Sequence, residues 1–252
     1  MLDYFKGPVQ GLQDFTTLAG QAIGNIWRRP HYWDDILIQM DTIGVGSLTI
    51  AVFTGFFSGI VMALQMGRAL GQYGQTERTG EVVSIILVRE LGPVLTALMI
   101  AGRNSSGMAS ELGSMKVTEQ IDAMRALGID PIQKLVTPRM IATAIMLPCL
   151  TVIADFIGMV GGYVVSALVY HLRAHQYWTT TWQALEWSDV VQGLLKPFIF
   201  SFAVSLVGCY YGLNTTGGTQ GVGKATTQAM VTASMWIFVL TAIITKIFVS
   251  ST

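Results

Sequence analysis

The sequence has few charged residues: Asp, Glu, Lys and Arg make up only 12% of its 252 residues, against about 25% in ordinary soluble domains. Its 15 basic and 15 acidic residues cancel, so no net field favours binding to nucleic acid. It has only two cysteines and three histidines, which form neither a disulfide framework nor a metal-ligand spacing. We interpret Cys149 and Cys209 as small buried hydrophobic residues. With 52% hydrophobic residues, the chain is expected to be an integral membrane protein.

Five apolar stretches are long enough to cross about 30 Å of hydrocarbon as helices. They cover residues 43–66, 82–102, 140–170, 190–211 and 225–249. We therefore predict an all-α integral membrane protein with an interfacial amphipathic segment over residues 1–40 and a five-span domain over residues 41–252.

The first 40 residues carry apolar side chains at roughly helical spacing. These are Leu12, Phe15, Ile23, Ile26 and Trp27, followed by Arg28-Arg29-Pro30. The pattern favours an amphipathic helix in the inner-leaflet interface, with Trp27 and the arginines at headgroup depth. A frayed cytoplasmic tail is the alternative.

Lys and Arg counts predict the orientation of the spans, because cytoplasmic loops are enriched in these residues. With a cytoplasmic N-terminus, the inside segments contain Lys6, Arg28, Arg29, Arg103, Lys116, Arg125, Lys134, Arg139 and Lys224. The outside loops contain only Arg68, Arg78 and Arg173. We expect the N-terminus to be cytoplasmic and the C-terminus to be periplasmic.

The stretch "GGTQGVGKAT" resembles a nucleotide-binding P-loop, with Gly218, Gly223 and Lys224 in register. Ala225 replaces the Ser or Thr whose hydroxyl would hold Mg²⁺. The stretch joins two apolar spans rather than a strand and a helix, as a P-loop would. We interpret it as a cytoplasmic turn before the fifth span and expect no ATP hydrolysis by this chain.

The segment between spans two and three predicts a short helix at about residues 118–128. Thr118 can cap it, Gly128 can end it, and Pro131 prevents its continuation. Apolar side chains recur on one face at Val117, Ile121, Met124 and Leu127. Such a helix suits either a soluble partner or the membrane surface, and its sequence alone favours neither.

Charged residues inside the spans are the second functional signal, because such groups normally face a bundle interior or a cavity. Arg89 and Glu90 are adjacent, so they point about 100° apart on a helix and should contact different partners. Asp155 is a possible partner for Arg89. These groups act either as links between helices or as part of a substrate path. Gly92-Pro93 should distort span two.

Two GxxxG patterns should let helices approach closely. One runs from Gly55 to Gly59 and the other from Gly158 to Gly162. The pattern is common in membrane helices and identifies no particular dimer.

Four stretches together resemble the MlaE/YrbE family of ABC-transporter permeases. They are "LVRELGPVLTALMIAGR", "SELGSMKVTEQIDAMRALGIDP", "LVTPRMIATAIMLPCLTV" and "GVGKATTQAMVTASM". The resemblance extends over essentially the whole chain from about residue 40. It implies a lipid permease of the bacterial cell inner membrane, which moves phospholipid between that membrane and the periplasmic or outer-membrane side.

The resemblance also implies partners. The permease would be a homodimer above two cytoplasmic ABC ATPase subunits, beneath a periplasmic ring of MCE-domain proteins, and the ATPase could carry a small STAS-like regulatory subunit. ATP and Mg²⁺ would be bound by the ATPase, so this chain would need no cofactor or metal of its own and would be no enzyme.

By the same resemblance, the short cytoplasmic helix couples the permease to the ATPase. The coupling residues would be Glu119, Gln120, Ile121, Asp122, Met124, Arg125 and Asp130. Lipid would occupy a cavity lined by spans one, two and five. We assign the substrate path to Leu64, Gln65, Arg89, Glu90 and Asp155. Lys196, Arg68 and Arg173 are further headgroup candidates near the outer face.

Two other functions stay open from the sequence. An ion-coupled secondary transporter of a hydrophobic substrate would use Glu90 or Asp155 as its ion site, although no inverted repeat is visible. An Mce-type importer of sterol or another lipid would share the permease architecture.

Overall fold

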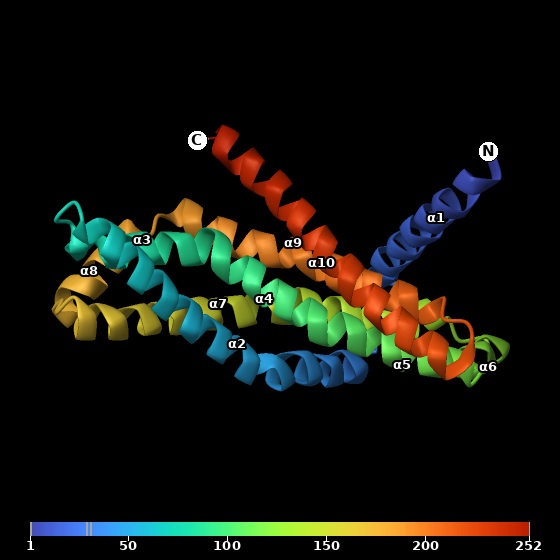
Figure 1. Ribbon diagram of the computed structural model, residues 1–252. Coiled ribbons are helices and arrows are strands. Elements are labelled where there is room, and N and C mark those ends of the chain that lie inside the picture. Colours follow the sequence, from blue (N-terminus) through green and yellow to red (C-terminus); the bar gives the residue numbers. More distant parts are fainter. Residues whose placement is uncertain (1, 29, 31, 252) are drawn as a thin grey trace. The chain divides into compact units, whose positions relative to one another are not determined.

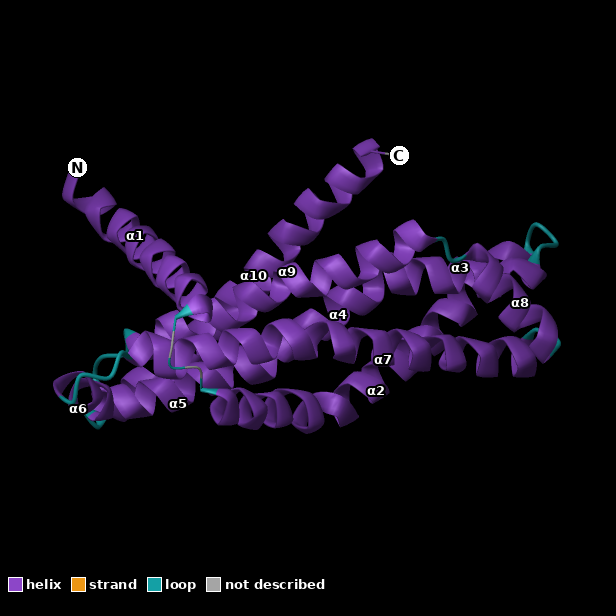
Figure 2. Ribbon diagram, turned by 180° about the vertical axis from the view of Figure 1, so that it is seen from behind, coloured by secondary structure: helices purple, strands orange, loops and turns teal. Residues whose placement is uncertain are grey.

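The computed structural model describes residues 2–28, 30 and 32–251, and in this part of the chain the regular structure is entirely helical (Figures 1 and 2). The α-helices are α1 Leu2–Gly24, α2 Trp33–Gly71, α3 Thr79–Ile86, α4 Gly92–Ile100, α5 Ser106–Val117, α6 Gln120–Ala126, α7 Thr137–Val169, α8 Ala174–Ala184, α9 Trp187–Leu213 and α10 Gly218–Ser251. Short 3₁₀ turns cover Asn25–Trp27 and Thr76–Arg78. Arg29 and the side chain of Lys6, both counted in the charge argument, lie outside the described part.

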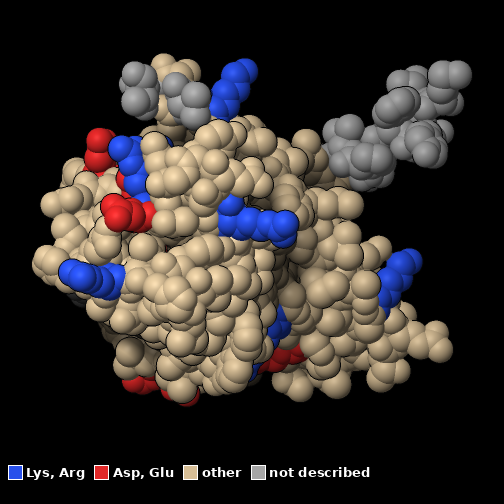
Figure 3. Space-filling view, turned by 60° about the vertical axis from the view of Figure 1, so that its left-hand side comes forward, with Lys and Arg blue, Asp and Glu red and all other residues tan. Residues whose placement is uncertain are grey.

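Five helical segments are long and apolar enough to cross a membrane, which confirms the predicted fold class. They are Trp33–Gly71, Thr76–Val117, Ile132–Val169, Trp187–Leu213 and Gly218–Phe248. Each is longer than the apolar stretch that predicted it, because the helix continues into polar residues. The face drawn in Figure 3 is mostly uncharged, with Lys, Arg, Asp and Glu confined to small separate groups, as expected for a surface that meets lipid.

Span two departs from α-helical geometry twice. Five-residue π-helical segments cover Leu87–Leu91 and Ala101–Ser105, and a third, at the start of span three, covers Ile132–Val136. The first lies directly before Gly92-Pro93, where the sequence predicts a distortion. π segments inside α-helices are frequent at functional sites.

The contacts of the chain group into two compact units, each built from three segments that are far apart in sequence. One unit contains Met1–Ile43, Ile100–Ile145 and Phe200–Ile237, and the other contains Gly44–Met99, Met146–Ile199 and Phe238–Thr252. The two are described separately below.

In the second unit, the glycines of the two GxxxG patterns bring α2 and α7 together within this one chain. A Cβ atom at Gly59 would lie 1.8 Å from the carbonyl oxygen of Gly158, and one at Gly55 would lie 2.3 Å from that of Ala154. Backbone therefore touches backbone, the arrangement that small residues permit between membrane helices. The predicted close approach is confirmed.

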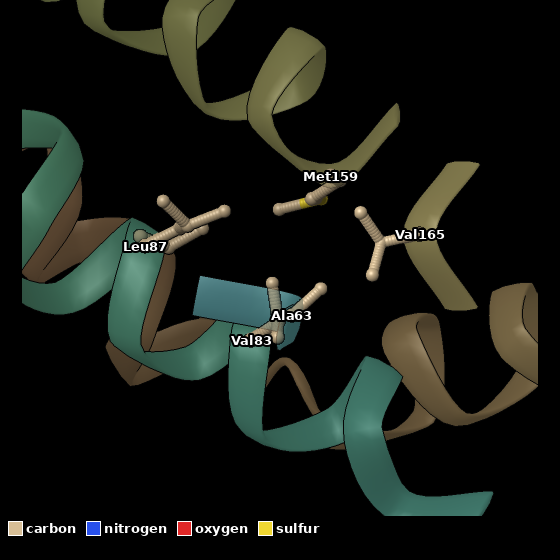
Figure 4. Packing of buried hydrophobic residues seen from close by; sticks show 6 residues of the cluster. Ala63, Val83, Leu87, Met159 and Val165 are labelled. Atoms are coloured by element: carbon tan, nitrogen blue, oxygen red, sulfur yellow. The ribbon is translucent and has the colours of Figure 1, made fainter. Parts of the chain in front are cut away.

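An apolar core lies next to this contact. Its buried residues are Ala63, Val83, Leu87, Val88, Met159 and Val165. Figure 4 labels five of them, which converge from α2, span two and α7. The fully buried Tyr177 of α8 donates its hydroxyl to the carbonyl oxygen of Met159, a member of this core, at 3.0 Å, and burial raises the pKa of its phenol.

In the first unit, α1 packs against α9 and the start of span three. Phe15 meets the Tyr210 ring edge-on at 5.7 Å, Leu18 and Ala22 are buried, and Thr137 donates to the Ala22 carbonyl oxygen at 3.3 Å. Leu12, Ile23 and Trp27 stay exposed. The segment is thus helical rather than frayed, and its place in a membrane interface stays a prediction.

Candidate functional site

The site begins with the backbone carbonyl of Arg89, whose α-helical partner is missing. In an α-helix, the N–H of residue 93 would bond to the carbonyl of residue 89, but Pro93 has no N–H. The Nζ atom of Lys196 donates to the Arg89 carbonyl oxygen at 2.7 Å instead. The proline therefore creates an acceptor, and a lysine from α9 satisfies it.

The side chain of Lys196 is completely buried. Besides the Arg89 carbonyl, its Nζ pairs with Glu90 Oε1 at 2.6 Å, and Thr245 of α10 donates to the same carboxylate oxygen at 3.0 Å. A buried ammonium needs such partners, since an unpaired charge is costly away from water. Because it is completely buried, Lys196 cannot itself present its charge to a lipid headgroup, and it holds Glu90 inside the unit instead.

Arg89 forms the second ion pair, between its Nε and Asp189 Oδ1. Asp189 lies in the first turn of α9, and its other oxygen accepts the Glu186 N–H at 3.1 Å. This contact is half of a capping box, and it fixes the carboxylate. Arg89 and Glu90 thus have different partners, as predicted, but the predicted pairing of Arg89 with Asp155 is wrong. Reasoning from the sequence missed Asp189, whose only signal is an acidic residue at the start of a span.

We call Arg89, Glu90, Asp189, Lys196 and Thr245 the charged cluster. It borders a cavity of about 260 Å³. The lining residues are Arg89, Glu90, Glu186, Ser188, Asp189, Gln192, Thr245 and Phe248. The side chains of Arg89 and Glu90 are 43% and 37% exposed, whereas those of their partners are almost fully buried. The cavity thus offers one accessible positive and one accessible negative group. Each of them forms an ion pair with a buried residue of opposite charge.

The remaining predicted path residues lie elsewhere in this unit. Leu64 and Gln65 are exposed on α2 and do not line the cavity of the charged cluster; the Leu64 carbonyl accepts the Tyr170 hydroxyl at 2.9 Å. Asp155 borders a separate, apolar cavity. The structure therefore brings together only Arg89 and Glu90 of the five. Cys149 is exposed, contrary to the sequence interpretation, and Cys209 is buried.

A comparison with known families decides what kind of membrane protein carries this cluster. Residues 36–247 match the family model described as Permease MlaE. The chain belongs to the MlaE permease family. It is thus a multi-pass membrane permease of the ABC-transporter type, which works with an ATPase subunit.

Curated relatives of this MlaE-family chain agree. A "Probable ABC transporter permease protein" of Rickettsia bellii is 41% identical over 239 residues, covering 95% of this chain and 92% of the relative. The "Intermembrane phospholipid transport system permease protein MlaE" of Haemophilus influenzae is 34% identical, covering 96% and 94%. The "Protein TRIGALACTOSYLDIACYLGLYCEROL 1, chloroplastic" of Arabidopsis thaliana is 35% identical, covering 92% and 66%.

In this MlaE-family chain, the helix predicted at 118–128 is shorter, because α6 covers only Gln120–Ala126. Thr118 is not its cap: the Thr118 hydroxyl donates to the Ser114 carbonyl of α5 at 2.9 Å. Glu119 has a φ of 60°, so the chain turns sharply there. Gly128 ends α6 as predicted, since its N–H bonds to the Arg125 carbonyl and that of Ile129 to the Met124 carbonyl, a Schellman motif.

The turn at Glu119 also divides the predicted apolar face. Val117 belongs to α5, Ile121 is fully buried, and Leu127 is 77% exposed. Ile121 therefore anchors α6 rather than presenting itself to a partner. Glu119, Gln120, Asp122 and Arg125 are exposed, and Met124 is partly buried.

Electrostatic contacts fix the exposed side of α6. Lys116 pairs with Asp122 at 2.8 Å, and Arg125 pairs with the same carboxylate at 3.2 Å. The hydrogen bond from Lys116 lowers the pKa of Asp122. Asp130 has a structural role: its Oδ1 accepts the Ile132 N–H at 2.9 Å and its Oδ2 accepts the Asn25 amide at 3.4 Å.

The P-loop-like stretch of this MlaE-family chain is helical, which corrects the predicted turn. Gly217 and Gly218 have φ values of 88° and 67°, and α10 begins at Gly218. Gly223 and Lys224 thus lie in the second turn of a helix, where N–H groups bond to carbonyls and cannot cradle phosphates.

Proposed function

We propose that this chain moves phospholipid between the bacterial inner membrane and the periplasmic or outer-membrane side, driven by ATP hydrolysis on a separate subunit. The observation that carries the proposal is the charged cluster beside its cavity. A phospholipid headgroup carries a phosphate and, in zwitterionic lipids, an amine. The half-exposed Arg89 would bind the phosphate, and the half-exposed Glu90 would bind the amine.

The exposure of two further residues supports their proposed role in the lipid path. Leu64 and Gln65 are exposed on α2, where a lipid tail or headgroup could contact them if a second copy of the chain completed the cavity. The proposed assembly is therefore a homodimer. The name of the Haemophilus influenzae relative, which specifies phospholipid, favours phospholipid over sterol as the substrate.

The proposed ATPase contact is α6. Its exposed charged residues and the protruding Leu127 form a surface outside the spans, of the kind that a soluble partner binds. Two ATPase subunits would bind ATP and Mg²⁺, and their closure would move α6 and the adjoining ends of spans two and three. A periplasmic ring of MCE-domain proteins and a small STAS-like subunit on the ATPase complete the proposed system. The N-terminus is then cytoplasmic, and this chain performs no covalent chemistry.

A lipid-binding measurement tests the proposed substrate. The chain is purified with its ATPase in mild detergent, and bound phospholipid is quantified by mass spectrometry. Because Arg89→Gln removes the accessible positive group, we expect bound phospholipid to fall by about tenfold or more. Arg78→Gln is the matched control, since Arg78 is exposed in the same unit but does not line the cavity.

Equal lipid content in the two variants would contradict the role of the charged cluster. Transport of a hydrophobic substrate by the purified chain alone, driven by an ion gradient without any ATPase, would contradict the ATP-driven function and support a secondary transporter.

A variant of α6 tests the proposed ATPase contact. Leu127→Asp places a charge on the most exposed apolar side chain of this region, so we expect recovery of the ATPase by affinity purification to fall by about tenfold. Tyr73→Asp is the control, because Tyr73 is 80% exposed in a loop of the other unit. Full recovery of the ATPase with Leu127→Asp would remove α6 from the interface.

A further inference from the structure

The second unit contains another cavity, of about 180 Å³, which is almost entirely apolar and is distinct from that of the charged cluster. Val88 of span two, Phe156 of α7, Trp182 of α8 and Val190 of α9 are among its lining residues. Asp155 provides its one ionisable group. We refer to it as the Asp155 cavity.

Asp155 is a buried carboxyl with which no side chain of the described residues pairs. It is 7% exposed, and its Oδ1 has no hydrogen-bond partner among the described residues. Arg89 and Lys196 lie close in the sequence to lining residues of this cavity, but both already form ion pairs with other carboxylates. Arg89 pairs with Asp189, and Lys196 pairs with Glu90. Because Oδ1 is closed off from the cavity, a partner from outside the chain would bond to the other carboxyl oxygen, Oδ2, for which the described residues also provide no hydrogen bond.

The backbone makes room for this carboxyl. A Cβ atom at Gly92 would lie 1.6 Å from Asp155 Oδ1, so only glycine at position 92 lets Asp155 occupy its place. A Cβ atom at Gly193 would similarly lie only 2.8 Å from the Val88 carbonyl oxygen. The carboxyl therefore sits against closely packed backbone at one side of a cavity whose other walls are hydrocarbon and aromatic rings.

We propose that the Asp155 cavity binds the hydroxyl end of a single aliphatic chain. A hydroxyl group both donates and accepts, so it can bond to the carboxyl whether Asp155 is ionised or protonated, whereas an ammonium can only donate. Cavities of about 150 Å³ in protein interiors accommodate benzene, so this one has room for a hydroxyl and roughly six carbon atoms. The proposal depends on Asp155 and its cavity and is independent of the proposed phospholipid function.

Trp182 lines the cavity and provides a fluorescence signal, because bromine quenches tryptophan on contact. The test uses the full chain in phosphatidylcholine nanodiscs with two matched probes, 6-bromo-1-hexanol and 1-bromohexane. The quenching due to Trp182 is the difference between the wild type and Trp182→Phe. At equal mole fraction in the bilayer, we expect half-maximal quenching by the alcohol at a concentration about tenfold lower than by the bromoalkane.

Three variants define the origin of that preference. Asp155→Leu should abolish it, whereas Asp155→Asn should keep most of it, because an amide still donates to and accepts from a hydroxyl. Val152→Phe, which fills the cavity from a lining position without adding a tryptophan, should abolish saturable quenching by both probes.

Equal quenching by the two probes in the wild type would overturn the proposal, as would an alcohol preference that survives in Asp155→Leu. If Asp155→Leu fails to fold, the probe pair on the wild type and on Val152→Phe decides alone: a preference unaffected by Val152→Phe would place the alcohol elsewhere.

Discussion

Lys196→Met is expected to destabilise the protein by about 3 kcal/mol, the loss typical when one member of a buried ion pair is removed. Methionine fills a similar volume but has no charge. Glu90 then lacks its cation, and the Arg89 carbonyl freed by Pro93 lacks its donor. Unfolding by SDS in mixed micelles, followed by circular dichroism, measures the change.

The double variant Lys196→Met with Glu90→Gln separates stability from transport. Replacing both charges removes the unpaired carboxylate, so most of the lost stability should return. Phospholipid transport by the reconstituted complex should nevertheless stay at least about tenfold below the wild type, because the accessible negative charge is gone.

Lys246→Met is the control for this pair, since Lys246 is exposed on α10, next to Thr245. It should change neither stability nor transport. Wild-type transport by the double variant would show that the charged cluster only holds the helices together, which is the alternative that the sequence left open.

Gly59→Leu is expected to prevent accumulation of folded protein. Even the Cβ atom of alanine would lie 1.8 Å from the Gly158 carbonyl oxygen, and the obstructing atom belongs to backbone, which cannot rotate away. For Gly59→Ala we expect a loss of about 3 kcal/mol, at the upper end of the usual range for overpacking. Size-exclusion chromatography of the fluorescently tagged chain measures folded yield, and SDS unfolding measures stability.

Gly107→Ala is the matched control, because a Cβ atom at this exposed position of α5 has nothing within 4 Å. Alanine favours helix over glycine by about 1 kcal/mol, so this variant should be as stable as the wild type or slightly more so. If Gly59→Ala behaved like Gly107→Ala, the contact between α2 and α7 would not be as close as described.

Local features of the fold were predictable from the sequence. The five spans follow from the length and polarity of contiguous stretches, and the family was evident from the "LVRELGPVLTALMIAGR" and "SELGSMKVTEQIDAMRALGIDP" blocks. The end of α6 at Gly128 and the distortion near Pro93 were also predictable, since each depends on the conformational limits of a single residue. These features arise from residues adjacent in the chain or from a repeating pattern.

The pairing of the charged residues was decided only by the tertiary structure. Arg89 and Asp189 are 100 residues apart, and Asp155 was an equally reasonable partner for Arg89 from polarity alone. The structure instead pairs Arg89 with a carboxylate fixed at the start of α9 and leaves Asp155 beside Gly92 in an apolar cavity. Which helices lie side by side, and at which rotation, depends on how side chains of different helices pack. A hydropathy pattern specifies that a helix crosses the membrane, but not which charged group on another helix faces it.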